Sequence, residues 1–92
     1  MTAVAEELEA LLRRAFSPTR LVLRDDSASH AGHAGAAAGG HFAVWLVSSR
    51  FSGLKQLERH RLVYAAAAPL LADRIHALQI NALTPEETGD SR

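Results

Sequence analysis

The 92-residue sequence contains no cysteine. The chain therefore cannot form a disulfide, use a thiolate nucleophile or build a metal site from its own sulfur ligands. It also has no excess charge of either sign, because ten lysines and arginines balance ten acidic residues. A neutral chain has no overall field that would draw it to nucleic acid or to an anionic membrane.

Long hydrophobic runs are missing as well, although 48% of the residues are hydrophobic. No run approaches the length of a membrane span. The N-terminal segment MTAVAEELEALLRR is acidic where a signal peptide is basic. We therefore expect a cytoplasmic protein that forms one small domain and makes no membrane contact.

The N-terminal half predicts one helix and two strands. The helix is indicated by an apolar stripe of Val4, Leu8, Leu11, Leu12 and Phe16. Thr2 is its expected N-cap, and Ser17-Pro18 is expected to end it. Residues 19–25 and 41–48 are predicted to be strands, because every second side chain of each segment falls on the same face. The two segments follow one another in the sequence, which favours an antiparallel pair.

A long helical segment begins near Leu54 in the C-terminal half. Pro69 is expected to divide it into a long helix and a short one that ends near Arg74. Residues 76–83 predict a third strand, with His76 and Leu78 on the same face.

The predicted order is α-β-β-α-α-β. This order indicates a single α+β domain over residues 1–84, in which a small mixed sheet of three strands carries helices on one face. Residues 85–92 are polar, and we expect them to form a disordered C-terminal tail.

Three of the five histidines fall within HAGHAGAAAGGH, residues 30–41. Alanine and glycine cannot hold such a segment in one conformation, and imidazole nitrogens are its only distinctive chemical groups. Either the histidines are solvated loop residues, or the loop serves to deliver one of them to a binding site. His41, at the start of a strand, fits a structural role better, with auxiliary ligation as the other reading.

Four segments together resemble the BolA family, and they cover nearly the whole chain. They are DDSASHAGH, HFAVWLVSSRFSGL, RHRLVY and IHALQINALTPEE. The resemblance implies a fold similar to a class II KH domain, with a three-stranded sheet. It also implies an adaptor that binds a CGFS monothiol glutaredoxin, in some members through a shared [2Fe-2S] cluster.

The same resemblance implies the cluster ligands. His76 corresponds to the invariant histidine, and His30 to the loop ligand, with His33 as the alternative. The sulfur ligands would come from the partner's cysteine and from glutathione, because this chain has none. Imidazoles on one iron and thiolates on the other resemble a Rieske-type arrangement, which raises the reduction potential. Read without the resemblance, His76 fits a strand-boundary residue satisfied by the backbone.

Basic residues gather between positions 50 and 61. They are Arg50, Lys55, Arg59 and Arg61, with His60 among them. They could bind an acidic or glutathione-bearing partner, or nucleic-acid phosphate, which would make the protein a KH-like DNA-binding transcriptional regulator. The GxxG loop of KH domains is absent, however. The alternative is a solvated helix face with one buried arginine that anchors the fold.

Trp45 alternates with the predicted core residues of its strand. It could therefore form a contact patch for self-association, or the fold could cover it on both sides. We expect a monomer or a weak homodimer. No spacing of serine, histidine and carboxylate supports a triad, and no glycine-rich phosphate motif precedes a helix. The sequence therefore predicts that the protein is not an enzyme.

Overall fold

The computed structural model describes residues 3–26 and 40–89, so Thr2, His30 and His33 lie outside the described residues. The described elements are, in order, α1 (Ala3–Phe16), β1 (Arg20–Asp25), β2 (Gly40–Val47), the 3-10 helix η3 (Ser49–Phe51), α2 (Gln56–Leu71), β3 (Ile75–Leu83) and α3 (Pro85–Thr88). Within the described parts of the chain, no helix is long and apolar enough to cross a membrane.

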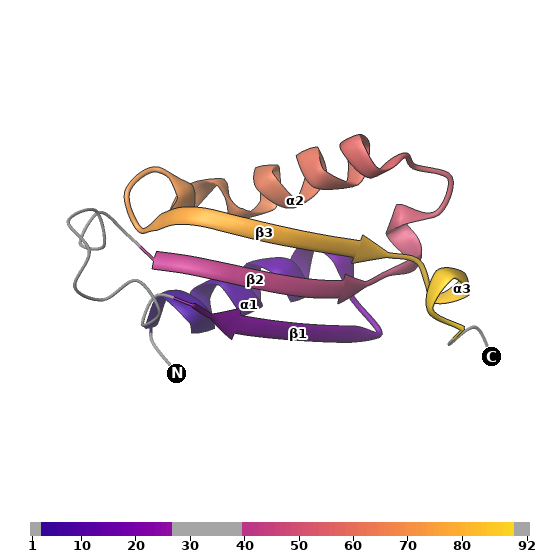
Figure 1. Cartoon of the computed structure of the whole chain (residues 1–92), viewed down its shortest axis with the longest axis horizontal. Coiled ribbons are helices and arrows are strands. Elements are labelled where there is room, and N and C mark those ends of the chain that lie inside the picture. The colour runs from indigo at the N-terminus through magenta and orange to yellow at the C-terminus, as the bar shows by residue number, and fades with distance from the viewer. Residues whose placement is uncertain (1–2, 27–39, 90–92) are drawn as a thin grey trace.

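The three strands form one mixed sheet in the order β1-β2-β3 (Figure 1). β1 and β2 are antiparallel, with Val22 opposite Trp45. β2 and β3 are parallel, with Val44 opposite Ile80. A parallel pair needs a long crossover, which α2 provides. The predicted α+β class and mixed sheet are confirmed.

α1 and α2 pack on the same face of the sheet (Figure 1). The buried cluster between them comprises Ala5, Leu8, Leu12, Phe16, Phe42, Val44, Leu46, Phe51, Val63, Ala67, Leu70, Ile75, Leu78 and Ala82. Alternation along β2 explains its share, because every second side chain of a strand points to the same face. The predicted stripe of the first helix is confirmed, since Val4 and Leu11 also pack against this core.

Pro69 does not divide the second helix, so the predicted short helix ending near Arg74 is wrong. α2 continues through Pro69 to Leu71. Proline removes one hydrogen bond, the one to the carbonyl of Ala65 four residues earlier. Both residues are exposed, so water can satisfy that carbonyl. The proline also lies so close to the helix end that only two residues follow it.

The chain is also ordered beyond residue 84, so a disordered tail from residue 85 is wrong for Pro85–Thr88. Thr84 caps α3: its hydroxyl accepts a hydrogen bond from the Glu87 N–H at 3.3 Å, and its own N–H donates to the Glu87 carboxylate at 2.8 Å. Gly89 ends the helix at φ 79°, a conformation that glycine adopts without strain. Residues 90–92 lie outside the described residues.

Candidate functional site

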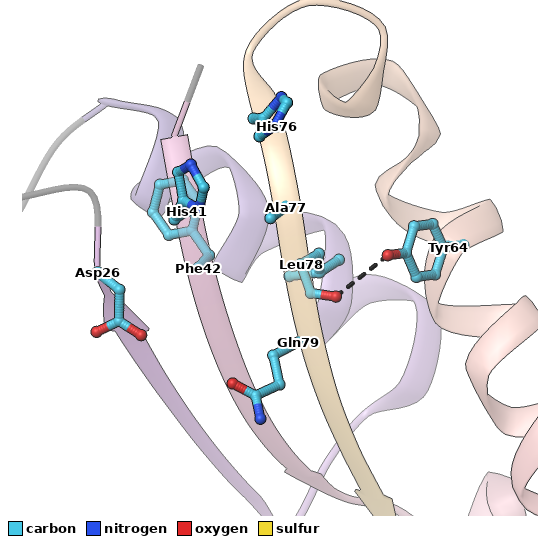
Figure 2. Close-up of a pocket in the computed structure, with 8 residues that line it drawn as sticks. All are labelled: Asp26, His41, Phe42, Tyr64, His76, Ala77, Leu78 and Gln79. Atoms are coloured by element: carbon cyan, nitrogen blue, oxygen red, sulfur yellow. Dashed lines mark hydrogen bonds between the residues drawn. The ribbon is translucent and has the colours of Figure 1, made fainter. Parts of the chain in front are cut away.

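His41 and His76 lie side by side at one end of the sheet (Figure 2). Their ring centroids are 5.2 Å apart, with the ring planes inclined by 46°. Each histidine is the second residue of its strand, and the two strands are parallel neighbours. Neighbouring parallel strands begin at the same end of a sheet, so the topology brings these two side chains together.

A β-bulge sets the position of His76. Gly40 is opposite Ile75, but the next residue, His41, is already opposite Ala77, so His76 is an extra residue in β3. Such an insertion interrupts the alternation of side chains and re-aims them. Ile75 and Leu78 are both buried, while His76 between them is exposed. The predicted shared face for His76 and Leu78 is therefore wrong, because the bulge releases the imidazole from the core face.

The two histidines border a hollow of about 420 Å³ (Figure 2). It is lined by Asp26, His41, Phe42, Tyr64, His76, Ala77, Leu78 and Gln79. The backbone N–H of Asp26 donates to the carbonyl of His41 at 2.7 Å. Asp26 and Gly40 flank the segment that contains His30 and His33. The chain therefore leaves and re-enters the described structure beside His41.

The His41–His76 spacing suits ligation of one metal ion. Two imidazoles bound to one tetrahedral metal, with each nitrogen about 2.1 Å from it, hold their ring centroids roughly 5 Å apart. Among residues 3–26 and 40–89, no group of three or more histidine, aspartate and glutamate side chains is placed to hold a metal. The described residues thus offer a pair of neighbouring imidazoles rather than a full set of metal ligands.

Tyr64 ties α2 to β3 beside this hollow, a contact that the sequence analysis missed. Its hydroxyl donates to the carbonyl of Leu78 at 3.1 Å. The ring of His60 packs against the Tyr64 ring, with centroids 4.7 Å apart. The spacing of these two residues, four positions apart on a helix, was the available signal. His60 itself is exposed and does not line the hollow.

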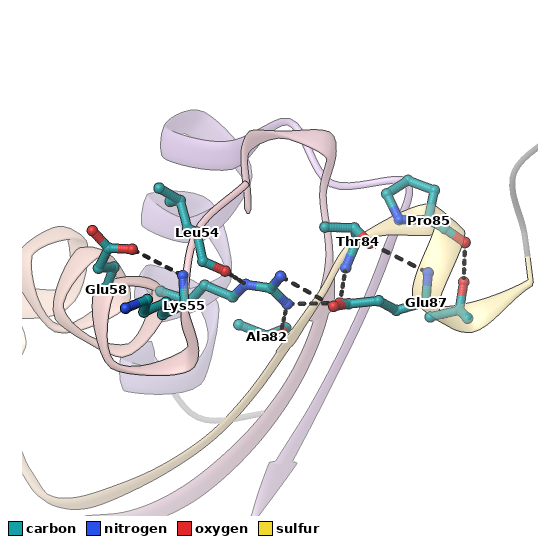
Figure 3. A network of polar contacts seen from close by, with 9 residues as sticks. Leu54, Lys55, Glu58, Ala82, Thr84, Pro85 and Glu87 are labelled. Atoms are coloured by element: carbon teal, nitrogen blue, oxygen red, sulfur yellow. Dashed lines mark hydrogen bonds and ion pairs between the residues drawn. The ribbon is translucent and has the colours of Figure 1, made fainter. Parts of the chain in front are cut away.

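Arg59 is buried and connects the C-terminal elements. Figure 3 shows the residues that it contacts, Leu54, Ala82 and Glu87. Its guanidinium donates to the carbonyls of Leu54 at 2.9 Å and Ala82 at 3.0 Å. It also donates to both carboxylate oxygens of Glu87, at 2.6 and 3.1 Å. The guanidinium of Arg59 is therefore occupied by contacts within the fold, and its role in binding a partner or nucleic acid stays a prediction. The alternative reading, a buried anchoring arginine, is confirmed.

The same contacts change the acidity of Glu87. Hydrogen bonds from the Arg59 guanidinium, and then from the Thr84 N–H, stabilise the charged carboxylate. They lower the pKa of Glu87 from 4.5 to about 2. The carboxylate therefore keeps its charge, and its hold on Arg59, far into the acid range.

The other basic residues of this region remain exposed: Arg50, Lys55 and Arg61. Each is therefore available to an acidic partner or to phosphate. The burial of Arg59 reduces the predicted group of four cations to three.

Trp45 is half-buried, and the guanidinium of Arg24 lies 5.1 Å from the centre of its ring. The same Arg24 donates to the Asp26 carboxylate at 2.7 Å. Trp45 is thus neither fully open nor fully covered, and its role in self-association stays a prediction. Val22, on the neighbouring strand, is the exposed apolar residue there, with 49% of its surface accessible.

The fold and the histidine pair define a small α+β domain with potential nitrogen ligands where two parallel strands begin. The family model for BolA-like protein matches residues 12–87. The chain belongs to the BolA family, as its sequence segments indicated.

Relatives of known name are similar over most of the chain. BolA-like protein 1 of Pongo abelii is 46% identical over 88 residues, which cover 96% of this chain and 63% of that protein. The DNA-binding transcriptional regulator BolA of Escherichia coli is 40% identical over 84 residues, 91% of this chain and 78% of the relative. The chain thus spans less than two thirds of the length of the mammalian relative.

Solved structures agree with this assignment. BolA1 from Arabidopsis thaliana superposes with a TM-score of 0.82 at 37% identity, covering 95% of this chain and 97% of that one. The solution structure of BolA1 from Mus musculus gives a TM-score of 0.81 at 43% identity, covering 98% of this chain and 72% of the other.

Proposed function

We propose that the protein is a cytoplasmic BolA-family adaptor that acts by binding rather than by catalysis. It binds a CGFS monothiol glutaredoxin and supplies histidine ligands to a [2Fe-2S] cluster shared between the two proteins. The role is in iron–sulfur cluster trafficking or in iron and redox regulation. The observation that supports this proposal most is the His41–His76 pair, in which His76 is exposed and His41 is half-buried. Their ring centroids are 5.2 Å apart, and the pair lies beside the two ends of the segment that holds His30 and His33.

In this proposal His76 is the fixed ligand, because the bulge turns its imidazole out of the core. The second nitrogen comes from His30, His33 or His41. His41 joins the two loop candidates because its ring already lies beside that of His76. The partner and glutathione supply the thiolates, since the chain has no cysteine. Imidazole ligands raise a cluster's reduction potential, and their protonation competes with iron.

The test is anaerobic reconstitution with a CGFS glutaredoxin, iron, sulfide and glutathione, followed by visible absorption and circular dichroism. The expected result is a spectrum distinct from that of the glutaredoxin alone, which His76→Ala abolishes. His30→Ala, His33→Ala and His41→Ala then identify the second ligand, because only its loss should alter the mixed spectrum. His60→Ala is the matched control, since this exposed histidine lies outside the hollow.

Two results would contradict the proposal. One is a spectrum that never departs from that of glutaredoxin alone. The other is a mixed spectrum that His76→Ala leaves unchanged. If the two proteins form a complex that carries no cluster, the adaptor role stands and the proposed cluster ligation is wrong.

A second candidate is a DNA-binding transcriptional regulator. It is favoured by the name of the Escherichia coli relative and by the exposed Arg50, Lys55 and Arg61. Binding to duplex DNA should weaken steeply with salt. Arg61→Ala or Lys55→Ala, each of which removes a phosphate contact, should lower the affinity and make its salt dependence shallower. Arg13→Ala, in the exposed part of α1, is the control. Equal affinities for all these variants would argue against this function.

A further inference from the structure

The two edges of the sheet differ in how they are protected. At β3, side chains of α2 occupy outward carbonyls: the Tyr64 hydroxyl donates to Leu78, and the Arg59 guanidinium donates to Ala82. Capping of this kind prevents another strand from pairing along that edge. Among the described strands, this leaves β1 as the edge open to pairing.

The backbone of β1 is oriented for pairing on its outer side. The N–H of Asp26 donates to the carbonyl of His41 on β2. Along an antiparallel strand, the backbone N–H and C=O groups of alternate residues point toward the neighbouring strand and away from it. Arg24 and Val22 therefore also face β2 through their backbone groups, while Leu21 and Leu23 direct theirs away from it. No described residue is hydrogen-bonded to these outward groups.

The side chains of β1 are also incompletely covered. Leu21 and Leu23 pack against the core but are only half-buried, whereas Phe42, Val44 and Leu46 on β2 are buried. On the other face of the sheet, Val22 is 49% exposed. A strand added beside β1 would cover apolar surface on both faces.

We propose that β1 pairs antiparallel with β1 of a second copy of this chain, which joins two three-stranded sheets into one. Charge selects the register. With Leu23 opposite its own symmetry mate, Arg20 lies opposite Asp26 of the second copy, where it would add to the ion pair that Asp26 already makes with Arg24 of its own chain. Val22 then lies opposite Arg24 of the second copy. A shift that places Val22 opposite itself sets Arg20 against Arg24, and like charges directly opposite are destabilising.

This register makes a prediction that depends on charge sign at Val22. Val22→Lys places a positive charge opposite Arg24 of the second copy, twice per dimer, whereas Val22→Glu places a negative charge there. We expect the first to raise the dimer dissociation constant and the second to lower it, each by roughly threefold to thirtyfold. Val22 is exposed, so neither substitution removes a core contact.

The experiment is sedimentation equilibrium of the full chain and both variants, up to millimolar concentration and at low salt. Circular dichroism melts of each variant check that the fold is retained. Opposite shifts for lysine and glutamate support the proposal, which is independent of any metal. A chain that stays monomeric throughout, a dimer that ignores both substitutions, or a dimer that both weaken would each overturn it.

Discussion

Arg59 and Glu87 form a two-point ion pair that joins α2 to α3, with nitrogen–oxygen distances of 2.6 and 3.1 Å. The same guanidinium satisfies carbonyls of Leu54 and Ala82. One side chain thus fixes the loop before α2, the end of β3 and the C-terminal helix. This arrangement makes the fold depend on a residue whose sequence context suggests a surface cation.

Arg59→Met should lower the free energy of unfolding by about 2–4 kcal/mol, because two acceptor carbonyls lose their donor. Urea denaturation measures the difference. Arg61→Met on the same helix is the control, and its exposed side chain should cost less than about 0.5 kcal/mol. Equal losses for the two variants would show that Arg59 does not anchor the fold.

Glu87 should make the stability sensitive to acid. Its pKa is about 2 in the folded chain against an ordinary value of 4.5, so its stabilising contribution is complete above pH 4.5. The contribution declines as the pH falls from there toward 2. In denaturation series between pH 7 and pH 2, the gap in stability between the native chain and Glu87→Gln should shrink over this window. A gap that stays constant would contradict the ion pair.

Ser48 should be a sensitive buried position. Its hydroxyl donates to the carbonyl of Phe16 at 2.7 Å and accepts from the N–H of Arg50 at 3.1 Å, which joins α1 to η3. Ser48→Ala should cost about 1–3 kcal/mol, since the Phe16 carbonyl loses a buried hydrogen bond and the Arg50 N–H loses a partly buried one. Thermal or urea denaturation beside the exposed Ser49→Ala tests this, and comparable costs at the two positions would refute it.

Ser17 should be improved by glycine. It follows α1 with φ 44°, in the left-handed region that disfavours residues with a Cβ atom. Ser17→Gly should raise the free energy of unfolding by about 0.5–1 kcal/mol, and Ser17→Ala should give no such gain. If glycine destabilises the chain as much as alanine does, the backbone here is not under strain.

The sequence predicts the sheet and the first helix well because their apolar residues repeat at the periods of strands and helices. The end of α2 is predicted wrongly because a proline two residues before the end of a helix costs little helix stability. That cost depends on the position of the proline in the helix, which the residue type does not reveal. The order at Pro85–Thr88 was signalled by Thr84 and Glu87, spaced as a capping box with proline between them. Composition alone hides that signal, because a short polar segment that contains a proline is typical of loops.

The candidate site was only partly accessible from the sequence. The resemblance singled out His76, but the β-bulge that exposes it comes from tertiary pairing of β3 with β2. The sequence favours a structural role for His41, because no local pattern indicates that the first residues of two strands will be neighbours. The burial of Arg59 likewise depends on Glu87, 28 positions further along the chain.

The most direct test of the proposed cluster is pulsed electron paramagnetic resonance of the reduced mixed complex. The chain would carry ¹⁵N-labelled histidine, and the glutaredoxin would be unlabelled. The account predicts ¹⁵N couplings of iron-bound imidazole that His76→Ala removes and His60→Ala retains. A reduced cluster in the mixed complex with no ¹⁵N coupling would show that no histidine of this chain binds its iron.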